Sequence, residues 1–208
     1  MKIFRSMKTN WITQKFGKEN TYPASLAFYQ SLGLDGHNGW DFAVFGCSLG
    51  LNSNPQNKCE PVYYDVSCAG EVVQMGLDDK AGLGIVVRTE DKDGIFKHIW
   101  WHEHSLDPAI KIGDKLETGD LMGWGGTTGL STGPHVHRGM KPQGRDTYGN
   151  YYKLQPNNGY DGAIDLTPYF ENVFVLDKIE AQKKQISFLQ QIINLLKILI
   201  ALRLTIKK

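Results

Sequence analysis

Hydrophobic and polar residues alternate in short runs over the first 175 positions, and Gly, Asn and Pro separate the runs. The run "WDFAVFG" is typical of one strand, and "EPVYYDVSCAGEVVQMG" predicts two strands joined near Ala69 and Gly70. The segment "GIVVRTEDKDGIFKHIWWHEHS" predicts a hairpin with Asp93 and Gly94 in its turn, and "DKLETGDLMGWGG" predicts another strand pair. Many short strands at regular spacing predict a mainly β domain, a small antiparallel β-sandwich or barrel-like body.

Three segments depart from this pattern before the last 33 residues. Residues 24–32 are the one part of this region with the character of a short helix. Residues 46–61 and 141–162 are polar and rich in turn formers, so both are predicted loops. A loop as long as the second is often functional, and its four tyrosines make it a candidate wall of a substrate groove.

From residue 176 the periodicity becomes helical, with no Gly or Pro. Isoleucines at 179, 186, 193 and 200 are seven residues apart, and leucines follow two of them by three residues. We therefore expect two units: a β-rich domain over 1–175 and an amphipathic C-terminal helix over 176–208. Such a helix is suited to self-association, to membrane contact or to packing on its own domain.

Composition and charge change this picture little. The chain has 208 residues and a net charge of +1, so no global charge indicates nucleic acid as a partner. The tail carries +5, which leaves −4 on the first 176 residues. The three cysteines form no CxxC pair; either one disulfide and one free thiol, or three free thiols, fits the sequence. The first residues lack the apolar run of a secretory signal peptide.

Four histidine and aspartate positions carry candidate chemistry. His37 and Asp41 are four residues apart in "GHNGWDFAV", and His135 and His137 are two apart in "TGPHVHRGM". Both spacings place side chains on one face of a strand. Zinc accepts histidine nitrogen and aspartate oxygen, and a catalytic zinc site keeps three protein ligands and a water. The two pairs together therefore predict a zinc site, with one ligand still to be assigned within the second pair.

These motifs resemble those of the lysostaphin-type, LytM-like zinc metalloendopeptidases of bacterial cell walls. The family carries HxxxD and HxH signatures, the second in the context Ser-Thr-Gly-Pro-His-x-His, and this chain reads "STGPHVH". The segments "ITQKFG", "IKIGDKLETGDLMGWGGTTG" and "GYDGAIDLTPYF" resemble further family segments in the same order. The resemblance covers roughly residues 11–170.

The resemblance implies that His37, Asp41 and His137 are the zinc ligands and that His135 faces the substrate. A second catalytic histidine lies, in the family, nine residues before a glycine, and that spacing selects His104 over its neighbour His102. The family has an aromatic residue where this chain has His102, which is a departure. One catalytic histidine takes the proton of a metal-bound water and the other stabilises the oxyanion; the sequence does not divide these roles.

The resemblance implies an enzyme that hydrolyses peptide bonds of peptidoglycan stems or cross-bridges, with Zn²⁺ as cofactor. A non-catalytic cell-wall-binding or regulatory module on the same fold is the main alternative. A sugar-phosphotransfer carrier is a third, but it has no need of Asp41. The expected place of action is the bacterial cell wall, and without a signal peptide a phage-released or virion-associated enzyme fits.

Overall fold

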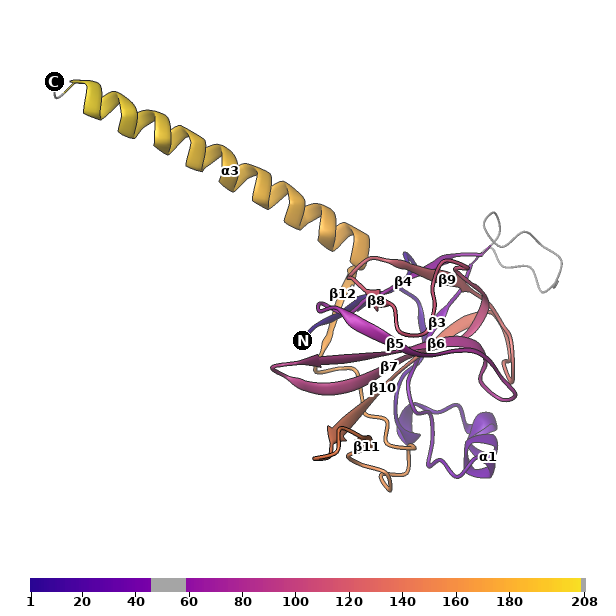
Figure 1. The fold of residues 1–208 in the computed structure, drawn as a ribbon. Helices are drawn as coiled ribbons and strands as arrows, with labels where there is room; N and C mark the ends of the chain where they lie inside the picture. Colours follow the sequence, from indigo (N-terminus) through magenta and orange to yellow (C-terminus); the bar gives the residue numbers. More distant parts are fainter. Residues whose placement is uncertain (46–58, 207–208) are drawn as a thin grey trace.

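The computed structural model describes residues 1–45 and 59–206, with side chains as far as Leu199 (Figure 1). The strands are β1 (Ile3–Arg5), β2 (Ile12–Gln14), β3 (Trp40–Ala43), β4 (Pro61–Tyr63), β5 (Gly70–Asp78), β6 (Gly82–Asp91), β7 (Gly94–Leu106), β8 (Lys115–Leu116), β9 (Leu121–Gly125), β10 (His135–Arg145), β11 (Tyr151–Lys153) and β12 (Phe170–Phe174). The helices are the short 3-10 helix η1 (Lys18–Asn20), α1 (Pro23–Ser31) and α3 (Val175–Ile206). The prediction of a mainly β fold with a C-terminal helix is confirmed.

Ten of these strands form one open sheet. Its main path is β2-β3-β10-β7-β6-β5-β8, and all of these neighbours are antiparallel. Strand β11 pairs with β10, and β9 joins β4 to the far end of β7. Strands β1 and β12 form a separate parallel pair. The long strands β7 and β10 are therefore the centre of the sheet, and residues on them can reach both of its faces.

One face of the sheet is a core of aliphatic and aromatic side chains that also buries a charged group. Arg138 on β10 is fully buried, makes a two-bond pair with the carboxylate of Asp65, and lies over the ring of Trp100 at 4.1 Å. His98 contacts Arg138 through Nδ1 and Thr89 through Nε2. A buried charge of this kind persists because its partners satisfy it. His98 is thus part of the core.

The predicted short helix is α1. Pro23 stands at its first turn, where the fixed φ and missing N–H of proline are tolerated. Gly33 follows the last turn with a φ of 76°, a left-handed conformation that glycine adopts without strain. The helix so bounded is short, and side chains on it line the same cleft as residues of β3 and β10.

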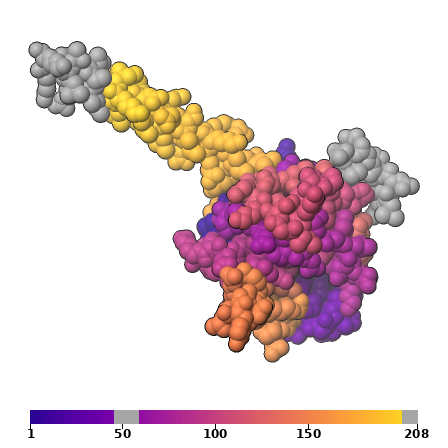
Figure 2. All heavy atoms as spheres, in the orientation of Figure 1, coloured from indigo at the N-terminus to yellow at the C-terminus, as the bar shows by residue number. Residues whose placement is uncertain are grey.

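The C-terminal helix leaves the body of the molecule after its first turns (Figures 1 and 2). Val175 is buried, and Leu176 and Ile179 pack with Phe4 and Phe174 in a small second core. Beyond them most apolar side chains are exposed up to Leu199. Within the described part of the chain, no helix combines the length and apolarity that crossing a membrane requires. The division into two folding units at residue 176 stays a prediction.

The loop predictions have mixed outcomes. Residues 46–58 of the first predicted loop lie outside the described residues. The prediction of a loop over 141–162 is wrong for the parts of this segment that form strands. Strand β10 continues to Arg145 and pairs with the antiparallel strand β11. Of the two cysteine alternatives, three free thiols is wrong: Cys59 is disulfide-bonded and Cys68 is free.

Candidate metal and catalytic site

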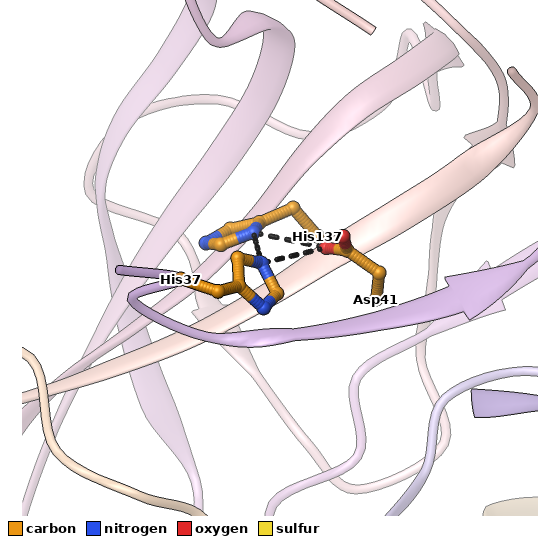
Figure 3. Close-up of side chains that lie close together, drawn as sticks. All are labelled: His37, Asp41 and His137. Atoms are coloured by element: carbon orange, nitrogen blue, oxygen red, sulfur yellow. Dashed lines mark hydrogen bonds and ion pairs between the residues drawn. The ribbon is translucent and has the colours of Figure 1, made fainter. Parts of the chain in front are cut away.

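Three of the predicted residues meet at one point of the sheet. Asp41 on β3 is the direct cross-strand partner of His137 on β10, so their side chains share one face. His37 lies just before β3 and turns its ring towards both (Figure 3). The His37 Nε2 atom lies 3.0 Å from the His137 Nδ1 atom, and each nitrogen lies 3.1 Å from Asp41 Oδ1. The side chain of His37 is almost fully buried, and the side chains of Asp41 and His137 are 11% and 13% exposed.

Backbone contacts orient the rings. The His37 Nδ1 atom lies 3.0 Å from the Lys15 carbonyl oxygen, which accepts a hydrogen bond only if Nδ1 carries the proton. In a neutral ring this leaves the Nε2 lone pair facing the other two residues. A carbonyl partner on the far nitrogen is the usual way in which proteins fix a histidine that binds a metal.

The carboxylate of Asp41 supplies negative charge at the same point. Burial alone would raise its pKa, but the adjacent imidazoles of His37 and His137 hold the pKa of Asp41 well below its usual range. Asp41 is therefore ionised at neutral pH. An anion and two imidazole nitrogens directed at one point make a donor set that suits zinc.

The small size of Gly39 leaves room for the His137 ring. A Cβ atom at this position would lie 2.6 Å from His137 Cε1 and 2.7 Å from Nε2. Any other residue would push the ring away from Asp41. The glycine inside the HxxxD motif thus has a steric role that the spacing alone did not show.

Two further histidines face this group of three. His135 Nδ1 lies 2.8 Å from the Gly133 carbonyl oxygen, and its Nε2 lies 3.7 Å from Asp41 Oδ1. His102 Nδ1 lies 2.8 Å from the Thr128 carbonyl oxygen, and its ring centroid is 4.6 Å from that of His135. In both, the anchored Nδ1 leaves Nε2 for the site. Burial, with help from His135 and His137, lowers the pKa of His102 to about 4, so its ring is neutral and able to accept a proton.

The sequence predicted His104 for this place, but the structure has His102 at the cleft, and the catalytic role of either residue stays a prediction. His102 lines the cleft over the site, whereas His104 does not, and its backbone lies against Gly126. The reason is a bulge: Leu83 and Ile85 on β6 pair with Glu103 and Trp100 on β7, so β7 holds one extra residue. His102 has a φ of 66° there. An unbroken strand would turn His102 to the face of His98.

The cleft above these residues has a volume of about 550 Å³. Helix α1 forms one wall, with Tyr22, Phe28 and Tyr29, and β7 and β10 form the floor. The Tyr29 hydroxyl accepts a hydrogen bond from Gln14, and burial and the charge of Asp41 raise the pKa of Tyr29. Its ring lies 5.6 Å from that of His37. Sequence reasoning missed Tyr29, because only the packing of α1 brings it here.

Zinc fits this arrangement. A tetrahedral ion with bonds of about 2.0–2.1 Å has ligand atoms about 3.3 Å apart. The observed separations of 3.0 to 3.1 Å among the three ligand atoms are close to that value. His37, Asp41 and His137 are also the group of metal-binding side chains that lies close together in the described residues.

Comparison with known proteins agrees with the motif resemblance. Residues 59–160 match the sequence profile of Peptidase family M23. A glycyl-glycine endopeptidase, ALE-1, from Staphylococcus capitis is 35% identical over 68 residues, which is 33% of this chain and 18% of the relative. Lysostaphin from Staphylococcus staphylolyticus is 35% identical over 69 residues, 33% of this chain and 14% of the relative. The chain thus matches less than a fifth of the length of these relatives.

Two solved structures also align with parts of this chain. The catalytic domain of lysostaphin from Staphylococcus simulans aligns with 65% of this chain and 79% of its own, at 24% identity and a TM-score of 0.44. A zinc-containing peptidase from Vibrio cholerae aligns with 79% of this chain and 39% of its own, at 20% identity and a TM-score of 0.48.

The profile match includes His102, His135 and His137 but begins after His37 and Asp41. The coordinates supply what the match omits, because they bring both residues to His137. In its sequence profile and its curated relatives, the chain is similar to the LytM-like, lysostaphin-type peptidases of family M23.

Proposed function

We propose that the chain is a zinc-dependent endopeptidase that hydrolyses peptide bonds in peptidoglycan stems or cross-bridges. The observation that carries the proposal is the meeting of His37, Asp41 and His137 beneath two histidines whose Nε2 atoms face them. The relatives named glycyl-glycine endopeptidase and lysostaphin support the substrate class. The proposed place of action is the bacterial cell wall; delivery by a phage stays a prediction.

The three ligands would hold the ion, which supplies a Lewis acid for water and for the scissile carbonyl group. The chain's own residues do the rest. His102, neutral because of its burial, accepts a proton at Nε2 and later donates it to the leaving amine. His135, whose Nε2 atom lies 3.7 Å from Asp41 Oδ1, donates a hydrogen bond to the developing oxyanion when it is protonated. The Tyr29 hydroxyl keeps its proton and faces the same cleft as a further donor.

The test combines metal analysis with a turbidity assay on purified cell walls. Wild type, Asp41→Ala and His135→Ala are compared. We expect the wild type to contain one zinc per chain and to lyse walls, Asp41→Ala to lose metal and activity, and His135→Ala to keep metal and lose activity. Equal lysis by all three proteins would overturn the mechanism. Wall binding by a wild type that holds no zinc and lyses nothing would favour the non-catalytic module.

We further propose that the exposed part of α3 binds an anionic membrane surface. Its exposed heptad side chains are Ile186, Leu189, Ile193 and Leu196. Exposed apolar side chains beside them widen this stripe: Phe188, Ile192, Leu195 and Leu199. No acidic residue follows Glu180, whereas six basic residues do. Lys184 pairs with Glu180, but two copies side by side would bring the remaining cations together without carboxylates to pair them, whereas anionic lipids would neutralise them.

The full-length protein and its Leu189→Asp/Ile193→Asp variant can be sedimented with phosphatidylglycerol or phosphatidylcholine vesicles. We expect the wild type to bind the anionic vesicles selectively and the variant to lose this binding. Both positions are about half exposed, so the body of the protein is not disturbed. An oligomer that the same substitutions dissociate, without vesicle binding, would assign the helix to a second copy instead.

A further inference from the structure

The floor of the cleft continues along β10 and β7 beyond the ligands. Alternate residues of a strand share one face, so His137, Gly139 and Lys141 point into the cleft together. Their cross-strand partners on β7 are Trp101, Ile99 and Lys97. Trp101, Ile99 and Lys141 all line the cleft. From the ligand end outward, the floor is therefore aromatic, then flat and apolar, then positively charged.

The charged end is a row of three cations on adjacent strands. Lys97 pairs in register with Lys141 on one side and with Arg88 on the other. We call Arg88, Lys97 and Lys141 the cation row. Like charges directly opposite each other destabilise a sheet. Burial lowers the pKa of Lys97, and the charges of Arg88, Lys141 and Lys153 lower it further.

The described residues around the row neutralise it only in part. The carboxylate of Asp161 pairs with Lys141 at 2.5 Å and also with Lys153, which lies outside the cleft. Arg88 donates to the side-chain oxygen of Gln143 and lies over the ring of Tyr151, and neither partner is charged. Its cross-strand partner on β5 is Glu71, which is exposed and forms no ion pair with it within the described residues. Lys97 has no carboxylate partner within the described parts of the chain. At least one partly buried positive charge is therefore left over.

We propose that the cation row binds a carboxylate of the substrate peptide. This inference rests on the proposed endopeptidase function and adds a specificity subsite to it. Lys141 lies four positions beyond His137 on β10, which is about 13 Å along the strand. An extended peptide lying on the floor would cover this distance with about four residues. Gly139 and Ile99 leave the path between them without a polar obstacle.

The experiment uses two forms of a cross-linked muropeptide, one with free stem carboxyl groups and one with these groups converted to carboxamides. The proteins are wild type, Lys97→Met, Lys97→Glu and Lys92→Met. Lys92 is the matched control: it lies in the turn of the same hairpin, is exposed, and its substitution removes the same charge. The full-length chain is used throughout, loaded with zinc.

We expect Lys97→Met to lower kcat/KM for the carboxylate form about tenfold, the loss of one charge-assisted contact, while the carboxamide form is cleaved as by wild type. Lys97→Glu should reverse the preference between the two forms. Lys92→Met should match wild type on both. Lys97→Met should also melt no lower than wild type, since it removes two like-charge contacts. An unchanged ratio between the two forms in both Lys97 variants would overturn the subsite.

Calorimetric titration of the proteins with the carboxylate and carboxamide forms of the muropeptide separates this proposal from the endopeptidase function. If wild type cleaves neither form, the proposed function fails, and binding alone tests the cation row. Tighter binding of the carboxylate form that is lost in Lys97→Met then supports the row. Equal binding of both forms by wild type overturns it.

Discussion

The Nε2 atom of His37 lies 3.0 Å from the Nδ1 atom of His137, although 100 positions separate the two residues in the chain. The register of β3 against β10 produces this contact, because it sets Asp41 opposite His137 and carries the loop before β3 to the same place. Both nitrogens also meet the carboxylate of Asp41. A shift of one residue in the pairing of β3 with β10 would turn their side chains to opposite faces, so the site depends on this register.

The choice between two neighbouring histidines is directly testable. His102→Ala should lower kcat for wall hydrolysis by about 100-fold or more, the usual contribution of a general acid–base group. His104→Ala is the matched control and should stay near wild type, since its side chain does not line the cleft. Both variants should keep their zinc. A larger loss in His104→Ala than in His102→Ala would restore the assignment made from spacing.

Gly39→Ala should move the His137 ring. The new methyl group would lie 2.6 Å from Cε1 of that ring, a distance that forces a shift. We expect weaker zinc binding and a loss of activity of about 100-fold, as for other displacements near 1 Å. Gly133→Ala is the control for zinc binding, because the space around its Cβ position is open. Zinc titration and turbidity assays measure both effects, and an unaffected Gly39→Ala would refute the steric role.

Glu103 should make stability depend on pH. It is fully buried, its two carboxylate oxygens have no hydrogen-bond partner, and burial raises its pKa well above the usual value. The folded state thus holds a proton that the unfolded state releases at lower pH. The buried carboxyl group therefore destabilises the fold least below the ordinary glutamate pKa, and stability is lost as the pH rises from that value towards the folded pKa.

Replacing Glu103 by Met should therefore stabilise the protein, by about 1–3 kcal/mol at neutral pH, as expected for removing unpaired buried polar atoms. The gain should grow as the pH is raised. Urea unfolding at several pH values measures it. A variant that is less stable than wild type at pH 8 would show that the carboxyl group has a partner in solution.

The buried pair of Arg138 and Asp65 should show strong coupling. Arg138→Met leaves the Asp65 carboxylate without its two bonds and should cost about 3–5 kcal/mol of unfolding free energy. The double variant Arg138→Met/Asp65→Asn should lose less than the sum of the two single variants. Chemical unfolding of all four proteins completes the cycle. Additive losses would mean that the pair contributes nothing beyond packing.

Much of the fold was predictable because local periodicity reports it. Alternating runs gave the strands β3, β6 and β7, and the turn at Gly94 was placed by its own sequence. The helix over Val175–Ile206 was predicted from its seven-residue spacing of isoleucines, because a helix forms its backbone hydrogen bonds within its own segment. The continuation of β10 beyond Lys141 was not predicted, because Pro142 and Gly144 are typical of loops. The strand forms there because it pairs with β7.

The HxxxD and HxH spacings by themselves brought out His37, Asp41 and the pair His135 and His137 as candidate residues, and the family resemblance implied His137 as the third ligand. Only the tertiary structure placed His102 at the cleft, because one extra residue in β7 turns its side chain there. It also decided that Lys97 stands between two other cations. Spacing within one strand fixes which side chains share a face, whereas bulges and cross-strand partners are set by neighbouring strands far away in the chain.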